Sequence, residues 1–176
     1  MFLVVTGGSG SGKSAFAEDQ VLKLGDRRRI YIATMMCFDE ESKKRVARHR
    51  EMRKNKKFET LECYTGLESV SVPEGSVVLL ECMSNLTANE IYAPGGAGEN
   101  TVAAVLRGIR RIRSQAAHLV VVTNEIFSDG TVYDPETTGY LQKLGRINQE
   151  MVRLADQAVE VVYGIPVYLK GEEYAS

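Results

Sequence analysis

Short runs of apolar, mostly β-branched residues alternate along the chain with longer segments of helical periodicity. These runs lack the polar–apolar alternation of a half-exposed sheet, which is typical of strands covered on both faces. Strands that alternate with helices indicate an α/β fold with a mostly parallel sheet and right-handed crossovers. The expected strands span residues 2–6, 29–33, 77–81, 119–124 and 158–163, with 167–169 as a short edge strand.

Two segments carry apolar residues at spacings of three and four, the pattern of amphipathic helices. The first stripe consists of Val102, Val105, Leu106 and Ile109, with the arginines of that segment largely outside it. The second consists of Leu141, Leu144, Ile147, Met151 and Leu154. Between the strands and helices, residues 94–98 are glycine-rich and are expected to form a flexible surface loop rather than a linker between domains.

A glycine-rich motif directly follows the first expected strand. It reads Gly7-Gly8-Ser9-Gly10-Ser11-Gly12-Lys13-Ser14 and precedes a helical segment, which is the strand–loop–helix context of a phosphate-binding P-loop. Glycines let the backbone wrap closely around a phosphate, so that N–H groups and the helix N-terminus face the anion. Lys13 would then reach the β- and γ-phosphates of a nucleotide, and Ser14 would hold Mg²⁺. The alternative, a Gly/Ser-rich turn with an unrelated lysine, does not explain the spacing and the flanking elements.

Polar residues end the other expected strands, where ligands bind in open parallel sheets. Thr34 follows the second strand, Glu81 ends the third, and Glu125 lies just beyond the fourth. Two carboxylates and a P-loop at one edge predict a metal–nucleotide site. For each carboxylate the alternative is a solvated strand end or a helix cap.

Basic residues are concentrated in the helical segment 45–57, where seven of them surround His49. A solvated helix face is the ordinary interpretation of such a run. The whole chain is not basic, however, and the segment lies one crossover from the P-loop, so its arginines are also suited to gripping a triphosphate or a second anionic substrate. Among cations we expect His49 to stay uncharged, and an uncharged imidazole is a competent nucleophile.

Composition narrows the class of protein. The 176 residues, 44% hydrophobic and with a net charge of −1, predict one catalytic domain over 1–176 and no broad electrostatic surface for nucleic acid. No apolar stretch approaches a membrane span, and residues 2–5 are too short for a signal peptide. Three cysteines, Cys37, Cys63 and Cys82, favour reduced thiols over a disulfide framework. We therefore expect a cytoplasmic protein.

Taken in order, the motifs resemble those of one family. They are Gly7–Ser14, the strand end Tyr31-Ile32-Ala33-Thr34, Arg45-x-x-x-His49-Arg50-x-x-Arg53, Thr60-x-Glu62, Leu79-Leu80-Glu81-Cys82, Val122-Thr123-Asn124-Glu125, Gly145-x-x-Asn148-Gln149, Ala155-Asp156 and Gly164-x-Pro166-x-x-Leu169-Lys170. The sequence is similar over essentially its whole length to the bifunctional adenosylcobinamide kinase/adenosylcobinamide-phosphate guanylyltransferases of cobalamin biosynthesis. The resemblance implies a P-loop NTPase fold of the RecA-like type.

The resemblance implies two reactions. A kinase moves the γ-phosphoryl group of ATP or GTP to the aminopropanol hydroxyl of adenosylcobinamide. A transferase then forms a guanylyl-histidine from GTP and passes GMP on to give adenosylcobinamide-GDP. Family members assemble as homo-oligomers, with a trimer as the expected state.

The residue roles that the resemblance implies follow the motifs. His49 matches the guanylylated position and Lys13 the catalytic lysine, while Ser14 and Glu81 match the positions that hold Mg²⁺. The expected nucleotide contacts are the P-loop residues Gly7 to Ser14 together with Ile32, Ala33, Thr34, Arg50, Arg53, Glu62 and Glu81.

The chain departs from the family pattern after Glu125. Residues 126–135 replace a Gly-rich turn with Val-Pro, and residues 140–143 replace an Arg-Asp segment. The departure concerns the corrinoid contacts rather than the nucleotide site. Two other functions stay open on the residues alone: a P-loop kinase of another small molecule, with His49 incidental, and a nucleotide-binding regulatory module.

Overall fold

A seven-stranded sheet runs through the molecule in the order β3-β2-β4-β5-β1-β6-β7. The computed structural model describes residues 1–37 and 39–172, apart from the side chains of Arg45 and Met52. Neighbouring strands are parallel except for β6 and β7, which pair in antiparallel fashion. The strands are β1 (Phe2–Thr6), β2 (Arg29–Ala33), β3 (Phe58–Glu62), β4 (Val77–Glu81), β5 (His118–Val122), β6 (Gln157–Val162) and β7 (Ile165–Lys170).

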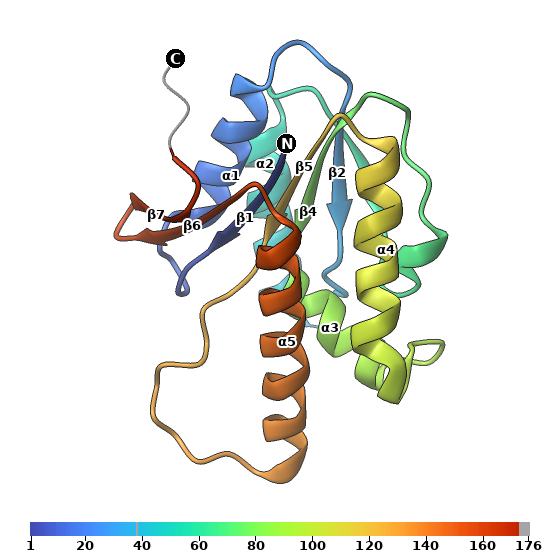
Figure 1. Cartoon of the computed structure of the whole chain (residues 1–176), viewed down its shortest axis with the longest axis vertical. Helices are drawn as coiled ribbons and strands as arrows, with labels where there is room; N and C mark the ends of the chain where they lie inside the picture. The colour runs from blue at the N-terminus through green and yellow to red at the C-terminus, as the bar shows by residue number, and fades with distance from the viewer. Residues whose placement is uncertain (38, 173–176) are drawn as a thin grey trace.

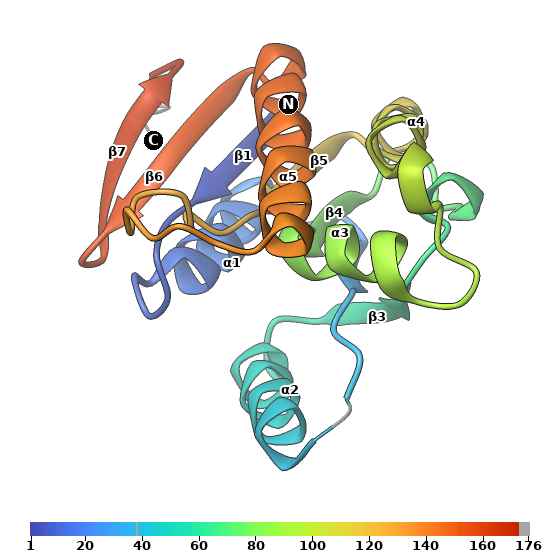
Figure 2. The same cartoon turned by 90° about the horizontal axis from the view of Figure 1, so that it is seen from below.

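Helices cover both faces of this sheet (Figure 1). On one face lies α1 (Lys13–Lys23), and on the other lie α3 (Met83–Tyr92), α4 (Thr101–Gln115) and α5 (Pro135–Leu154). Figure 2 shows α2 (Glu40–Arg53) apart from α3, α4 and α5, in the crossover between β2 and β3. Short 3₁₀ turns, η1 (Leu67–Ser69) and η2 (Gly98–Asn100), complete the described elements. None of the described helices has the length and apolar character needed to cross a bilayer.

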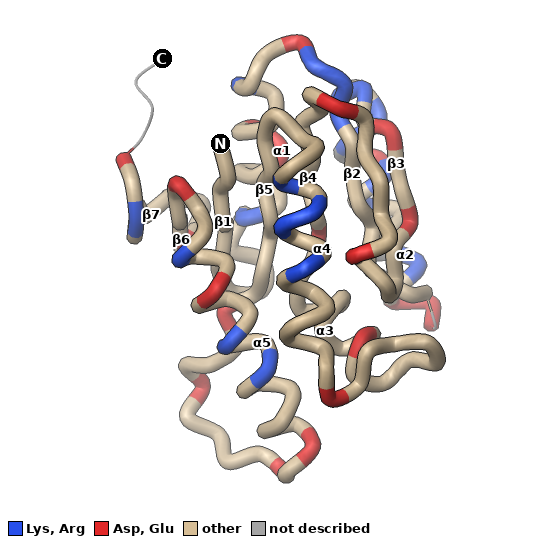
Figure 3. Tube along the Cα trace, turned by 45° about the vertical axis from the view of Figure 1, so that its right-hand side comes forward, with Lys and Arg blue, Asp and Glu red and all other residues tan. Residues whose placement is uncertain are grey.

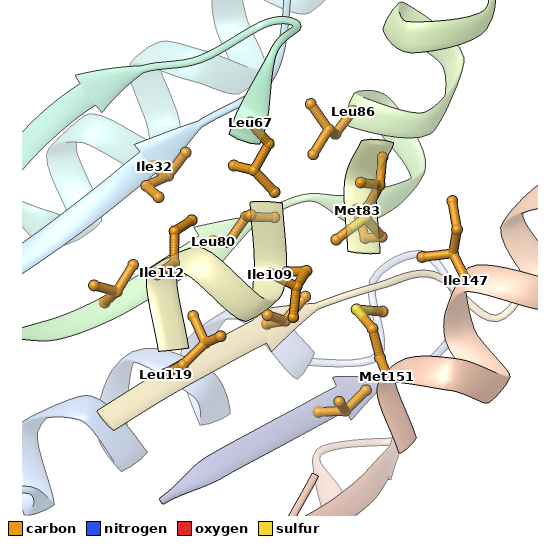
Figure 4. Close-up of a cluster of buried hydrophobic side chains, with 14 of the residues drawn as sticks. Ile32, Leu67, Leu80, Met83, Leu86, Ile109, Ile112, Leu119, Ile147 and Met151 are labelled. Atoms are coloured by element: carbon orange, nitrogen blue, oxygen red, sulfur yellow. The ribbon is translucent and has the colours of Figure 1, made fainter. Parts of the chain in front are cut away.

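Alternate residues of the central strands enter two separate cores. In β4, Val78 and Leu80 pack beneath α3, α4 and α5, whereas Val77 and Leu79 pack beneath α1. Figure 4 shows Leu80 with Ile109 of α4 and Ile147 of α5 in the larger core. Burial on both faces removes the polar–apolar alternation of a half-exposed sheet, so the α/β prediction is confirmed.

The α4 helix satisfies its predicted pattern. Val105 and Ile109 are buried, and basic positions recur along the helix in Figure 3. Two of its arginines hold the segment around η1, where Arg107 Nε lies 2.6 Å from Glu68 Oε2 and Arg111 Nε donates to Val70 O at 3.1 Å. Arg107 and Arg111, outside the stripe, therefore have structural partners.

The bounds of β1, β2 and β4 are those predicted, whereas the other strands differ. The fourth strand ends at Val122, and beyond it Thr123 Oγ1 donates to Asn148 Oδ1 and Asn124 Nδ2 to Ser84 Oγ. β6 is shifted by one residue toward the N-terminus relative to the expected 158–163, and β7 is longer than the expected 167–169. Sequence reasoning missed β3, an edge strand whose residues Phe58–Glu62 are mostly polar and half-exposed or exposed.

The glycine-rich segment 94–98 is anchored, contrary to the expectation of a flexible loop. The buried carboxylate of Glu90 accepts hydrogen bonds from Ala97 N at 2.9 Å and from Gly66 N at 2.7 Å. A Cβ on Gly96 would lie 2.5 Å from Glu90 O, so only glycine fits there. The segment thus packs closely on the end of α3.

Candidate active site at the phosphate-binding loop

The P-loop connects β1 to α1, as its sequence context predicts. Gly12 precedes α1 in the left-handed region at φ 92°, and Gly12 itself has no side chain to cap this helix. The N–H groups of its first turn are therefore available to an anion. Gly7 leaves β1 where a Cβ would lie 2.6 Å from Val161 O, so the loop passes close to β6. Across the loop, Lys13 Nζ donates to Gly8 O at 2.9 Å.

A cavity of about 470 Å³ opens in front of this loop. Its walls come from four parts of the fold: the P-loop with the start of α1, helix α2, the ends of β4 and β5, and the first turn of α3. The lining residues include Ser9, Gly10, Ser11, Gly12, Lys13, Ser14, His49, Glu81, Asn85 and Asn124. The cavity therefore brings together the P-loop, the histidine and one of the two strand-end carboxylates.

Glu81 lies at the centre of the polar contacts in this cavity. It is the last residue of β4, and its side chain is 7% exposed. Its Oε1 accepts a short hydrogen bond from Ser14 Oγ. Its Oε2 accepts a longer hydrogen bond from Tyr31 OH, at 3.2 Å. Burial, and secondly the Glu81 carboxylate, raises the pKa of Tyr31 far above its ordinary value, so Tyr31 stays protonated and keeps donating.

The α2 helix presents His49 to Glu81. Asp39 caps its N-terminus by accepting from Ser42 N at 2.6 Å, and few apolar side chains hold it to the sheet. His49 Nδ1 lies 3.5 Å from Glu81 Oε1, and the histidine side chain is 21% exposed. The expectation of an imidazole surrounded by cations is thus corrected, because His49 faces a carboxylate from β4.

Arg53 anchors the C-terminal end of α2. It is 6% exposed, and its guanidinium carbon lies 3.3 Å from the centroid of the Tyr31 ring, a cation–π contact. Arg50 is more exposed and lies 3.5 Å from Glu62 Oε1 of β3. The basic segment is therefore solvated at some positions only, because the face with His49 and Arg53 is turned inward.

A second, smaller cavity of about 120 Å³ lies on the other side of His49. It is lined by residues of β2, α2, β3 and β4, among them Ala33, Thr34, Arg50, Arg53 and Glu62. Five residues line both cavities: Met35, His49, Glu81, Cys82 and Asn85. The histidine and Glu81 thus stand between the P-loop cavity and the smaller cavity.

At two positions expected to contact the nucleotide, the side chain is engaged within the protein. Ile32 is fully buried in the larger core, so only its backbone is left to face a ligand. Thr34 Oγ1 accepts from Cys82 N at 2.8 Å and donates to Cys82 O at 2.9 Å. Its side chain therefore joins β2 to the end of β4.

Glu125 does not join the site. Its Oε1 accepts from Phe127 N at 3.0 Å and from Ser128 Oγ at 2.8 Å, so it orders the loop after β5. Glu125 is neither a ligand of the cavity nor a helix cap, because the next helix begins at Pro135 and is capped by Asp134. The predicted pair of carboxylates at the sheet edge is reduced to Glu81.

The oxygens of Ser14 and Glu81 fit Mg²⁺, a hard cation that prefers oxygen ligands. Their hydrogen bond shows that one ion can reach both side chains. Among the described residues, Glu18, His49 and Glu81 also offer ligand atoms within 4.8 Å of one another. The Glu18 carboxylate, however, already has a cation beside it, because Lys56 Nζ lies 2.5 Å from Glu18 Oε2. Ser14 and Glu81 therefore stay the predicted magnesium ligands.

Sequence reasoning did not find Glu18 and Asn85. Glu18 falls in the helical segment after the P-loop, and nothing in its neighbours along the chain shows that it is fully buried. Asn85 lies four residues after Glu81, in the first turn of α3, and lines both cavities. Extending the search from each strand end to the next helical turn would have found Asn85.

Comparison with known proteins identifies the family. The family described as cobinamide kinase / cobinamide phosphate guanyltransferase matches residues 3–169 of the chain. The chain belongs to this family. It is 31% identical over 186 residues to the bifunctional adenosylcobalamin biosynthesis proteins of Salmonella typhimurium and Escherichia coli, covering 97% of this chain and 100% of each relative. The predicted family is thereby confirmed.

A solved structure supports the fold class. An ATPase from the type III secretion system of pathogenic bacteria is 13% identical, with a TM-score of 0.53, over 90% of this chain and 51% of that chain. Together with the strand order, this likeness confirms the P-loop NTPase fold, and it carries no further functional argument.

The departure from the cobinamide kinase family pattern occupies the loop between β5 and α5 and, at residues 140–143, part of α5 itself. This loop exposes Val132 almost completely and Phe127 to 44%. Asp134 ends the loop as the N-cap of α5, where its side chain accepts from Thr137 N at 2.9 Å, and Pro135 begins the helix. The divergent segment thus lies outside the contacts between Ser14, Glu81 and His49.

Proposed function

We propose that this chain carries out both reactions of its family, with one P-loop serving two nucleotide-dependent steps. In the first, the γ-phosphoryl group of ATP or GTP passes to the aminopropanol hydroxyl of adenosylcobinamide. In the second, GMP from GTP passes through His49 to the phosphorylated product. The observation that carries this proposal is the position of His49 between the P-loop cavity and the smaller cavity.

In the kinase step the P-loop and Lys13 would hold the β- and γ-phosphates, and positioning supplies most of the catalysis. Mg²⁺, held by Ser14 and Glu81, would neutralise phosphate charge when bound. No protein nucleophile is needed for γ-phosphoryl transfer. This step therefore does not depend on His49.

In the transferase step the lone pair of a His49 ring nitrogen attacks the α-phosphorus of GTP. The nitrogen–phosphorus bond forms while the bond to the bridging oxygen breaks, and its electron pair leaves with pyrophosphate. The phosphate of the acceptor then displaces His49. Arg50 and Glu62, which line the smaller cavity, are suited to bind the ribose and guanine of the nucleotide.

Labelling distinguishes this function from that of a simple kinase. Incubation with α-labelled GTP and Mg²⁺ should give a covalent adduct that survives alkali and is lost in acid, as expected for a phosphoramidate. γ-Labelled GTP should leave no such label. His49→Ala should lose the adduct and guanylyl transfer but keep kinase turnover with adenosylcobinamide, whereas His118→Ala should label normally.

Two results would contradict the proposal. If His49→Ala still became labelled, the nucleophile would be another residue. If the wild-type protein never formed the adduct, while phosphorylating a small molecule, the chain would be a kinase alone.

We also propose that two or more copies of the chain associate through the β6–β7 hairpin. Ile165, Val167 and Leu169 alternate along β7 and so share one face, and Val162 lies opposite Ile165. All four are exposed, Ile165 by 65% and Leu169 by 62%. Exposed apolar side chains on an edge strand are suited to an identical surface on a second copy. Light scattering should show an oligomer that Val167→Lys/Leu169→Lys dissociates, and a monomeric wild type would refute this assembly.

A further inference from the structure

His49 has two ring nitrogens in different surroundings. Nδ1 is buried, has no hydrogen-bond partner among the described residues and faces Glu81 Oε1 at 3.5 Å. The ring itself lines the cavity in front of the P-loop. Since the two nitrogens point away from each other across the ring, Nε2 is the one left to face that cavity.

We infer that Glu81 is a positioning residue for His49: its carboxylate selects the tautomer that carries the proton on Nδ1, and the Nε2 lone pair is thereby directed toward the P-loop cavity. The inference rests on the proposed function for its chemical consequence. Its physical content, the tautomer of one histidine, is independent of any reaction. It gives Glu81 a role toward the histidine that is separate from its role toward the nucleotide.

The carboxylate is well placed for this role because its other oxygen is fixed. Tyr31 OH donates to Oε2 at 3.2 Å, and Tyr31 is itself covered by the guanidinium of Arg53 at 3.3 Å. Arg53 lies four residues after His49, so both project from the same face of α2. The helix is therefore docked at two adjacent points, Arg53 on Tyr31 and His49 on Glu81.

The tautomer matters for the covalent step. When Nε2 attacks the α-phosphorus, the ring acquires positive charge and its proton stays on Nδ1. A carboxylate beside Nδ1–H stabilises that charge through a charge-assisted hydrogen bond, and it holds the plane of the ring during the attack. When the acceptor phosphate later displaces Nε2, the ring returns to its neutral form with the same tautomer. No proton needs to leave the site in either direction.

Nuclear magnetic resonance can test the tautomer directly, because the chain has only two histidines. The protein is labelled with ¹⁵N-histidine and studied without nucleotide or Mg²⁺, and His118→Gln removes the second set of signals. The Nδ1–H form is expected in this protein and in Tyr31→Phe, which keeps the carboxylate. Glu81→Ala should lose the preference for Nδ1–H, and Glu81→Gln, whose amide oxygen still accepts, should keep part of it.

An Nε2–H tautomer in the wild-type background would overturn the inference. So would a Glu81→Ala variant that is folded, as judged by its amide spectrum, yet keeps the Nδ1–H form. If Glu81→Ala does not fold, the wild-type tautomer together with that of Glu81→Gln decides the question.

A rate measurement supplies the second readout. In a single turnover with α-labelled GTP, Glu81→Ala should label His49 about 100-fold more slowly or worse, with Glu81→Gln between it and the wild type. Equal labelling rates in the three proteins would overturn the positioning role. If the wild type shows the Nδ1–H form but never labels, the proposed function fails while the contact stands. If the wild type labels but shows the Nε2–H form, the positioning inference fails and the function stands.

Discussion

The pair formed by Glu18 and Lys56 provides a quantitative test of how α2 is held to the body of the protein. Glu18 is on α1 and fully buried, and Lys56 follows the end of α2 with 24% of its side chain exposed. Their charged atoms lie 2.5 Å apart, and the second oxygen of Glu18 has no hydrogen-bond partner among the described residues. Lys56→Met would leave this carboxylate buried and unpaired.

Removing one partner of a buried ion pair typically costs about 3–5 kcal/mol. We take about 3 kcal/mol, because Lys56 keeps some contact with water. For a chain of this size, 1 kcal/mol corresponds to roughly 2–4 °C in the melting temperature, so Lys56→Met should melt roughly 6–12 °C below the wild type. Lys54→Met is the matched control, because Lys54 pairs with Glu51 at 3.7 Å on an exposed surface. Such pairs contribute about 0–1 kcal/mol.

Urea denaturation and calorimetry of both variants measure the difference. The double variant Glu18→Leu/Lys56→Met, which removes both charges, should regain most of the stability lost in Lys56→Met, because no buried charge remains unpaired. If Lys56→Met and Lys54→Met lost the same free energy of unfolding, the buried pair would not stabilise the docked position of α2.

The remaining predictions concern the loop and the thiols. Lys13→Ala should reduce both kinase turnover and guanylylation by about 100-fold or more, since about 3 kcal/mol of transition-state stabilisation is lost with such a charge. The control Lys23→Ala, at the other end of α1, should leave both rates unchanged. Retained kinase turnover in folded Lys13→Ala would refute a shared phosphate site. Burial raises the pKa of Cys63 to about 11 and that of Cys82 above its ordinary value, whereas Cys37 is exposed. Because the thiolate is the reactive form, iodoacetamide at pH 8 should modify Cys37 first, and mass spectrometry should find the other two modified at comparable rates only after denaturation or well above pH 9; equal rates in the folded protein at pH 8 would contradict the buried thiols.

The sequence was most informative where the chemistry is local. The P-loop needs only consecutive residues and the two elements around them, so Gly7 to Ser14 could be placed on a loop between strand and helix. Strand ends are nearly as local, which is why Glu81 was found. Glu125 has the same kind of position in the chain, but its carboxylate is used by the loop after β5, and only the structure distinguishes the two.

The inward face of α2 could not be obtained in this way. The segment looks uniformly basic, and its helical period contains no apolar stripe that would mark a buried side. Arg53 is buried because an aromatic ring from β2 lies beneath it, and Glu18 is buried because Lys56 comes back to it after a long crossover. Such contacts depend on residues distant in sequence. The strand Phe58–Glu62 was missed for a related reason, since an edge strand needs few apolar residues.

The neighbours of β1 in the sheet determine how late during translation the P-loop can fold. The strand that leads into the P-loop lies between β5 and β6, both from the second half of the chain. The turn between β6 and β7 reaches the loop itself, where Gly164 N donates to Ser11 O at 2.8 Å. A nascent chain therefore carries its nucleotide-binding sequence outside the ribosome long before the strands that give it shape have emerged. Nucleotide capture should be among the last properties that each newly made molecule acquires, and stalled chains that stop before β6 should emerge without it.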